Sequence, residues 1–434
     1  MNVRRILRSI SLLWLGAVLG AFFAFLTQAL LARALGVHGY GSFASALAFI
    51  TVLAPIAGFG VPGFWLRVFG EEGRSALRWI RPSLYFLLSS SLSLFAGIML
   101  WAVFLEPSPN SSEILKILSF YIFGQVSTEL CISKAQLSGR YAEVAAWQML
   151  PHLLRLVIVA ILVQVATDTV TPMYVAYCYS FLSLCVACVS FFNINKILNG
   201  KVHLAGHDFG STVNYSVVKP AVYNVFKGAL PYGMVGLLYL LYFQSSVVLL
   251  GRMSGPVAAG AFNVAFVVLS AVYLFPNVIY QKFMMPMIQR WSYHDVAHSY
   301  YIFKLGSLLM LVIGLLAAGI VLLLTPRYLP FIFGEEFSTS VPILMSLAVC
   351  IPLRFVSSSS GAFLSAGAHV KAKIKIMSAA AVLNLTLGAY LISAYGVDGA
   401  VYSMITVEIT LLVCFTLYVW LKVFGGFRGS KHAG

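Results

Sequence analysis

Charged residues are scarce in this 434-residue chain: Asp, Glu, Lys and Arg together make up only 9% of it. A soluble domain has about a quarter of its residues charged. Hydrophobic residues make up 60%, so the chain has too little charge to cover a water-exposed surface of this size. The composition instead fits a lipid bilayer as the solvent, where each crossing by a helix needs about 20 apolar residues.

Catalytic and metal-binding motifs are lacking as well. The sequence has no Asp-rich metal motif, no Gly-rich phosphate loop followed by Lys and Ser or Thr, and no Ser, His and Asp set with a loop to carry it. We therefore expect neither an enzyme nor a resident metal or cofactor. The six cysteines all fall in apolar runs, and Cys185 and Cys188 have no His or Asp nearby, so we expect them to be packing residues.

Long apolar runs fill most of the chain and predict twelve membrane-spanning helices, six on each side of a polar stretch. The predicted fold is an all-α integral membrane protein made of two repeated six-helix bundles. Its predicted parts are an N-terminal bundle in 1–210, a cytoplasmic linker in 195–224 and a C-terminal bundle in 215–434. The predicted spans are 10–32, 41–66, 83–105, 113–136, 144–166, 171–194, 225–249, 257–284, 301–324, 339–366, 373–394 and 397–421.

A motif at the end of the first span recurs 219 residues later. Residues 30–46 and 249–265 are identical at seven of seventeen positions without a gap: two Leu, one Arg, two Gly, one Phe and one Ala. Each copy lies between two apolar runs, so we expect a helix with the Arg at its end, a glycine-permitted hairpin turn and a second helix. Because an even number of spans separates the copies, the bundles are predicted to be parallel repeats.

Lys and Arg are distributed unevenly between the gaps that separate the spans. With the N-terminus placed inside, 22 of them lie in the inside segments or at the adjoining ends of the spans, and four lie in the outside gaps or at the span ends next to them. This bias is the one that the positive-inside rule requires, so both termini and the linker are predicted to be cytoplasmic. The basic residues lie in short gaps and not in patches interleaved with aromatic residues. The net charge of +15 therefore indicates membrane orientation rather than nucleic-acid binding.

Few ionisable side chains lie inside the predicted spans, and each costs about 2.5–3.5 kcal/mol or more at the bilayer centre. Arg155 and Arg354 lie about a dozen residues from the cytoplasmic ends of their spans, which is too deep for easy snorkelling. We expect both to face a water-filled interior that binds an anionic substrate. Glu129 and Glu408 are either charge partners of these arginines or proton carriers, and the sequence leaves both roles open.

The outer ends of the first and seventh spans carry Arg33 and Arg252, for which two interpretations stay open. They either snorkel to the outer head groups or contribute to the substrate-binding lumen. Gln28 and Gln244 lie in the same two spans and are expected to be interior-facing hydrogen-bonding groups. The predicted substrate-binding set is Arg33, Arg155, Arg252, Arg354, Gln28 and Gln244.

Several short motifs resemble those of a known family of membrane proteins. They are Leu31-Ala32-Arg33-Ala34-Leu35-Gly36-Val37, Gly58-Phe59-Gly60-Val61 with Arg67, Leu364-Ser365-Ala366-Gly367, and Tyr395-Gly396-Val397-Asp398-Gly399-Ala400. Together with the number of spans they resemble the polysaccharide-transporter branch, the Wzx-like oligosaccharide-lipid flippases, of the MOP exporter superfamily.

This resemblance implies two six-helix bundles around a central lumen that exchange inward-open and outward-open forms. It implies a cargo of polyprenyl-diphosphate-linked sugar repeat units, moved from the cytoplasmic to the periplasmic leaflet of a bacterial inner membrane. The products served are O-antigen of lipopolysaccharide, capsule or exopolysaccharide. The implied partners are the lipid-linked oligosaccharide, membrane lipids and other polysaccharide-assembly membrane proteins, with no nucleic acid.

Two other functions stay open. A drug or small-molecule antiporter of the MATE type would need unpaired carboxylates in the lumen, whereas here the deep Arg residues at least match the deep Glu residues. A membrane polysaccharide polymerase or ligase would need a large periplasmic loop, whereas the largest predicted loop is cytoplasmic.

Overall fold

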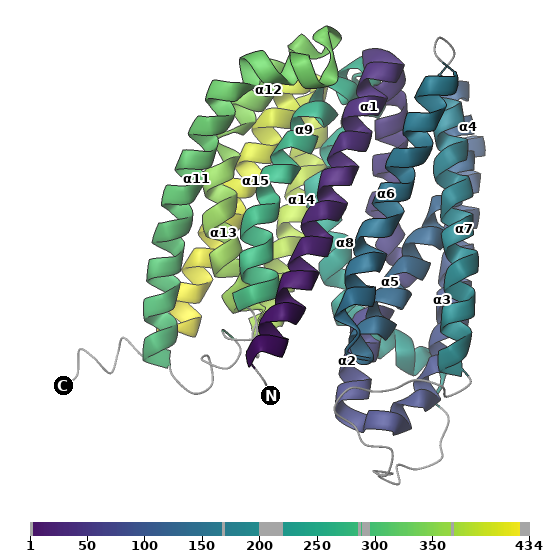
Figure 1. Ribbon diagram of the computed structural model, residues 1–434. Coiled ribbons are helices and arrows are strands. Elements are labelled where there is room, and N and C mark those ends of the chain that lie inside the picture. The colour runs from purple at the N-terminus through teal and green to yellow at the C-terminus, as the bar shows by residue number, and fades with distance from the viewer. Residues whose placement is uncertain are drawn as a thin grey trace, which may run out of the picture. The chain divides into compact units, whose positions relative to one another are not determined.

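The computed structural model describes residues 3–166, 170–198, 220–284, 288, 296–365 and 369–425, and these ranges form helices and turns without a strand. By its internal contacts the chain divides into two compact units, which are described separately (Figure 1). The first unit holds Met1–Leu30 and Ala46–Leu240, and the second holds Leu31–Ser45 and Leu241–Gly434. The all-α fold class is therefore confirmed.

The first unit consists of helices joined by short turns. Its elements are α1 (Val3–Gly58, apart from Leu31–Ser45), α2 (Val61–Glu72), the 3-10 helix η1 (Gly73–Trp79), α3 (Ile80–Phe104), α4 (Pro109–Leu118), α5 (Tyr121–Leu137), α6 (Tyr141–Val165), α7 (Pro172–Leu198) and the first part of α8 (Val222–Met253). In its interior, α5 packs against α2, α6 and α7. Close packing of α5 on α7 needs glycine at position 124, because a Cβ there would lie 2.7 Å from the Cα atom of Ser183.

The second unit is helical in the same way. Its elements are the rest of α8, α9 (Pro256–Asn277), the π-helix η2 (Val278–Met284), α11 (Val296–Phe333), the 3-10 helix η3 (Glu335–Thr339), α12 (Ser340–Leu347), α13 (Cys350–Leu364), α14 (Val370–Tyr395), α15 (Val397–Tyr418) and the π-helix η5 (Val419–Val423). In this unit α13 packs against α11 and α15, and α14 packs against α15.

Ten stretches of the described residues are long and apolar enough to cross a membrane. Nine pass on their own, and the tenth is the pair Glu335–Leu347 and Cys350–Leu364, which is bent by 50° at a short break. Each of the twelve predicted spans overlaps one of these stretches, and the longest, Ser11–Phe104, overlaps three of them. The chain is a multi-pass membrane protein.

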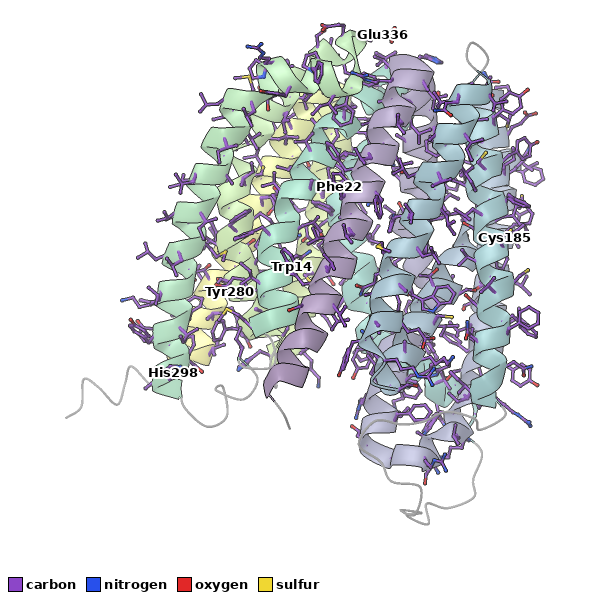
Figure 2. All side chains as sticks on the ribbon, viewed as in Figure 1. Trp14, Phe22, Cys185, Tyr280, His298 and Glu336 are labelled. Carbon is purple, nitrogen blue, oxygen red and sulfur yellow. The ribbon has the colours of Figure 1, made fainter. Side chains whose placement is uncertain are left out.

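Large apolar side chains are exposed on the outer helices of each unit. On α7, Phe181 and Phe192 are 66% and 70% exposed, and on α11 Leu323 is 81% exposed. Figure 2 shows side chains projecting outward from these helices. Extensive exposed apolar surface of this kind faces lipid rather than water.

The two copies of the repeated motif have the same backbone geometry. Gly36 has φ 63° and ψ 177°, and Gly255, 219 residues later, has φ 89° and ψ 174°. This region of backbone space is open essentially to glycine alone, so each glycine interrupts the helical path. The helices that follow end at Gly58 and Asn277, which are again 219 residues apart. The predicted helix, glycine turn and second helix are therefore present in both copies.

The second unit brings the two motif copies into contact with each other. A Cβ on Gly41 would lie 1.7 Å from the carbonyl oxygen of Pro256, and a Cβ on Gly260 would lie 2.5 Å from the carbonyl oxygen of Val37. Positions 37 and 41 correspond to 256 and 260 in the repeat, so the contact is reciprocal. Glycine is needed on both sides because two backbones meet there.

Unit boundaries divide both α1 and α8. Contacts group Leu31–Ser45 with the second unit and the residues up to Leu240 with the first. The predicted domain limits, 1–210 and 215–434, stay predictions. Most of the predicted linker, 199–219, lies outside the described residues.

Candidate functional site

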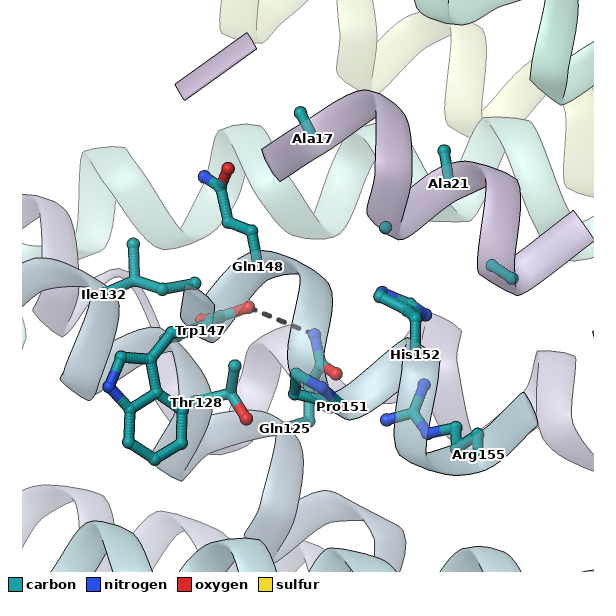
Figure 3. A pocket seen from close by; sticks show the side chains of 13 residues that line it. Ala17, Ala21, Gln125, Thr128, Ile132, Trp147, Gln148, Pro151, His152 and Arg155 are labelled. Atoms are coloured by element: carbon teal, nitrogen blue, oxygen red, sulfur yellow. Dashed lines mark hydrogen bonds between the residues drawn. The ribbon is translucent and has the colours of Figure 1, made fainter. Parts of the chain in front are cut away.

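A cavity of about 490 Å³ lies in the first unit between α1, α5 and α6 (Figure 3). Its wall on α1 carries only small side chains, because Ala17, Gly20, Ala21 and Ala24 share one face of that helix. Gly20 also allows α1 to approach α6, since a Cβ there would lie 2.8 Å from the backbone carbonyl oxygen of Gln148. The cavity exists because α1 presents no large side chain to fill it.

Arg155 on α6 brings a cation to this cavity. Its guanidinium carbon lies 4.8 Å from the ring centroid of Tyr121 and 5.5 Å from that of Tyr179, so two cation–π contacts support the charge. The Nε atom is buried without a hydrogen-bond partner, and Arg155 has no ion pair among the residues that the structure describes. The guanidinium therefore retains donors for a ligand.

Glu129 on α5 brings a carboxylate to the same cavity, where it is exposed. Its Oε1 atom accepts a hydrogen bond of 3.5 Å from Nε2 of Gln125, the dashed line in Figure 3. His152, half-buried on α6, also lines the cavity. Within the described part of the chain, Glu129 and Arg155 line one cavity without forming an ion pair, so both charges are available to a ligand.

Arg354 on α13 lies in the second unit, where it is 8% exposed. Its Nη1 atom donates to the hydroxyl of Tyr242 at 2.5 Å and lies 3.4 Å from Oε1 of Glu408. The rings of Tyr242, Phe243 and Tyr273 surround the guanidinium at 5.4–5.5 Å. A buried cation needs such a partner, because desolvating an isolated charge is expensive. The geometry makes Glu408 the charge partner of Arg354.

Arg33 is exposed and is bound to the end of α11. Its Nε atom donates to the carbonyl oxygen of Ile332 at 2.9 Å, and its Nη2 atom donates to that of Phe331. Carbonyls at a helix C-terminus lack partners in the helix and favour a cation. On the other side of the break in α1, Oε2 of Glu336 accepts a hydrogen bond of 3.3 Å from the backbone N–H of Val37. Both sides of the break are thus fixed to residues at or just after the end of α11.

The other predicted binding residues lie outside the cavity lining. Gln28 is half-buried in the first unit, Gln244 is half-buried in the second, and Arg252 is exposed near the end of α8. All three interact with other residues of the chain. Their predicted contribution to substrate binding stays a prediction.

Aromatic side chains at the cavity are absent from the sequence-based predictions. Trp147 lines it from α6, and its place on the helical face of Arg155, eight residues earlier, is a sequence feature from which it could have been predicted. Tyr121 and Tyr179 come from other helices, and no local pattern links them to Arg155. Among the described residues, no group of three or more His, Cys, Asp or Glu could hold a metal ion.

A comparison with protein families connects this architecture to known proteins. The model of a family described as "Polysaccharide biosynthesis protein" matches residues 6–292. The chain belongs to this family. A search among curated proteins finds no match to this chain.

Solved structures resemble this chain along almost its whole length. Lipid II flippase MurJ in an inward closed conformation has a TM-score of 0.69 at 13% identity, with 95% of this chain and 89% of MurJ covered. The MATE multidrug transporter DinF-BH has a TM-score of 0.65 at 15% identity, with 97% and 96% covered. An inward-facing multidrug resistance MATE family transporter of the MOP superfamily has a TM-score of 0.64 at 13% identity, with 95% of each chain covered.

At these identities the structural likeness shows the fold alone, which is the two-lobed helical fold of the MOP superfamily. The predicted resemblance to the polysaccharide-transporter branch of that superfamily is confirmed by the family match together with this fold.

Proposed function

We propose that this protein is a flippase that moves polyprenyl-diphosphate-linked oligosaccharide repeat units from the cytoplasmic to the periplasmic leaflet by alternating access. The observation that carries the proposal is the guanidinium of Arg155, which lines a cavity of about 490 Å³ in a member of a polysaccharide biosynthesis family. Guanidinium binds phosphate oxygens in a bidentate manner and keeps its charge when desolvated. A diphosphate is the part of the cargo that such a group suits.

The other arginines support this function in different ways. Arg354 is compensated by Glu408, so we propose that it contributes to the field of the second unit and binds cargo only when that pair opens. Arg33, just before the break in α1, and Arg252, at the end of α8, would meet the diphosphate late in its passage, with Gln28 and Gln244 as hydrogen-bonding groups in the same helices. Glu129 would be the charge that tempers Arg155 when the cavity is empty, or the coupling group.

The proposed setting is the bacterial cytoplasmic membrane, with both termini in the cytoplasm and no catalytic step performed by this chain. The cargo would serve O-antigen, capsule or exopolysaccharide synthesis. The proposed partners are the lipid-linked oligosaccharide, membrane lipids and other polysaccharide-assembly membrane proteins. The cation bias of the gaps between spans supports this orientation.

Replacement of Arg155 tests the proposal. Arg155→Ala should lower the flipping of lipid-linked oligosaccharide in reconstituted vesicles by about ten- to a hundredfold, which corresponds to losing a hydrogen bond to a charged group. Arg155→Lys should restore part of the rate, because a point charge lacks the guanidinium fork. Arg140→Ala is the matched control, since Arg140 directly precedes α6, the helix of Arg155, but has a side chain that is 65% exposed and lies outside the cavity. Full flipping by Arg155→Ala, at an unchanged protein level, would contradict the proposal.

One observation favours a second function, that of a MATE-type small-molecule antiporter. Glu129 offers an exposed carboxylate to the cavity, which is the group that a cationic compound would need. Efflux of ethidium from cells that express the protein distinguishes the two functions. A flippase should give no efflux, whereas an antiporter should give efflux that Glu129→Gln abolishes.

A further inference from the structure

The cavity in the first unit has two ends of different chemistry. Helices α5 and α6 pack together and are joined by a turn of three residues, 138–140, so they run antiparallel and residues equally far from the turn lie at one level. Tyr121 on α5 contacts Arg155 on α6, so these two residues lie at one level. Eight residues along each helix from this pair, towards the turn, lie Glu129 and Trp147. Glu129 therefore lies level with Trp147. Along α6, eight residues separate Trp147 from Arg155, a distance of about 12 Å at 1.5 Å per residue.

The Trp147 end is rich in hydrogen-bond acceptors. The carboxylate of Glu129 is exposed there, and the side-chain oxygen of Gln148 is buried without a hydrogen-bond partner. Thr128 donates its hydroxyl to the backbone carbonyl of Gly124, so towards the cavity it can only accept. Trp147 is half-buried and adds an aromatic surface. In Figure 3 the labelled Trp147 and Arg155 lie on opposite sides of the view, with Gln148 and His152 between the helices.

The balance of charge limits what can occupy the Trp147 end. Arg155 and Glu129 give the lining no net formal charge when His152 is neutral, and the cation lies at the far end. A phosphate group would be repelled by Glu129. For the oligosaccharide of the proposed function, the group that fits here is not anionic, offers several donors to carboxylate and amide oxygens, and presents an apolar face to an indole ring. A pyranose ring has hydroxyl groups at its edge and C–H groups on its faces, and therefore meets all three conditions.

We propose that Trp147, Glu129 and Gln148 form a sugar-recognition subsite, in which an uncharged pyranose of the lipid-linked oligosaccharide stacks on Trp147 and donates hydroxyl hydrogens to the two oxygen-bearing side chains. Arg155 holds the diphosphate at the other end of the cavity. These three residues then determine which oligosaccharides are accepted, whereas Arg155 accepts any diphosphate-linked lipid. The inference rests on the proposed function, because it takes the cargo to be a lipid-linked oligosaccharide.

Native mass spectrometry of the purified full chain tests this subsite, with two probes. One probe is the lipid-linked oligosaccharide fraction extracted from host cells that lack this protein, and the other is undecaprenyl diphosphate, which has no sugar. The wild type should bind the glycosylated lipid about tenfold more tightly than undecaprenyl diphosphate. Trp147→Ala should abolish that preference while keeping the affinity for undecaprenyl diphosphate, which also shows that the variant is folded. Trp147→Phe should keep part of the preference, and Glu129→Gln should reduce it.

Two further variants separate the subsite from the diphosphate site and from general effects. Arg155→Ala should weaken both probes equally. Trp14→Ala is the matched control, because Trp14 lies on α1, is 49% exposed and does not line the cavity. A preference that survives Trp147→Ala, or a loss of both probes in that variant while Trp147→Phe binds as the wild type does, would overturn the subsite alone. If the wild type binds neither probe, the proposed function fails and the subsite fails with it.

Discussion

Two deep arginines have opposite surroundings. Arg155 rests on the rings of Tyr121 and Tyr179 and lines a cavity, whereas Arg354 is buried and lies 3.4 Å from a carboxylate oxygen of Glu408. A cation–π contact supports a charge without neutralising it. An ion pair cancels most of the field that a ligand would feel. The proposed function therefore assigns cargo binding to Arg155, and Arg354 is suited to holding its unit together.

Removal of one charge of the Arg354–Glu408 pair should destabilise the protein. Glu408→Gln or Arg354→Met alone leaves a buried charge without its partner, and we expect each to lower the free energy of unfolding by about 3–5 kcal/mol. The double variant should be less destabilised than the sum of the single variants, because neither charge is then left alone. Thermal unfolding in detergent measures this cycle.

The exposed pair Arg67–Glu71, with a distance of 2.8 Å on α2, is the control for this cycle. Breaking it should change stability by less than about 1 kcal/mol, because solvent screens it. Strict additivity for Arg354 and Glu408 would show that the two charges are not coupled.

Residue-level prediction from the sequence was most specific where depth in an apolar run was informative. It singled out Arg155, Arg354, Glu129 and Glu408, because an ionisable group in the bilayer is costly wherever it lies. It left open which carboxylate accompanies which arginine, because that depends on helix packing. It gave no role to Trp147. An aromatic side chain in an apolar run has no free-energy cost in the bilayer, so nothing in the sequence distinguishes it from its apolar neighbours.

At the scale of helices, the break in α1 is predicted to be sensitive to any side chain at Gly36. Alanine there must adopt a backbone region that costs about 1–3 kcal/mol, and its Cβ would lie 2.9 Å from Oε2 of Glu336. Gly255→Ala has the same backbone cost but no atom within 4 Å of the new Cβ, so it should be milder.

Gly97→Ala on α3 is the control for the break, because it lies within a helix and has open space around it. It should raise stability by about 0.5–1 kcal/mol. Thermal unfolding midpoints of the three variants check the order. If Gly36→Ala were as stable as Gly97→Ala, the break would not be fixed by glycine.

Element-level prediction was most successful at the repeat. Gly36 and Gly255 have matched positive φ angles in the two copies of the motif, because identical local chemistry imposes identical turns. The sequence did not show that Leu31–Ser45 packs with the second unit and so separates from the rest of α1. An apolar helix face can pack against residues more than 200 positions away, as Gly41 does against Pro256. The local sequence pattern does not identify such a distant packing partner.

The orientation of the whole molecule is tested by its termini. If the excess of Lys and Arg in the inside segments sets the topology, reporter fusions at Lys201 and Ser430 should both show a cytoplasmic location. A periplasmic result at either position would mean that an odd number of spans was missed or added. The direction of cargo movement depends on this result, because it defines which end of the cavity faces each leaflet.

The membrane potential should bias transport if the cargo is a diphosphate. Such a cargo carries about two negative charges, and each charge moved through 100 mV is worth about 2.3 kcal/mol. Since bacterial interiors are negative, outward movement is favoured by roughly 4–5 kcal/mol per 100 mV. After the cargo is released, the positive charge of Arg155 is less compensated. The return of the empty protein to its inward-facing form moves this positive charge inward, which a negative interior also favours. No coupling ion is therefore required.

Vesicles that carry a potassium diffusion potential, without a pH or sodium gradient, provide the measurement. Flipping should accelerate when the compartment that corresponds to the cytoplasm is made negative, and Glu129→Gln should keep this response. In that case the carboxylate only tempers the field of Arg155. A flipping rate that does not change with the potential but does change with a pH step would contradict this scheme. If Glu129→Gln also abolished the pH response, Glu129 would be a proton carrier and the potential would not be the driving force.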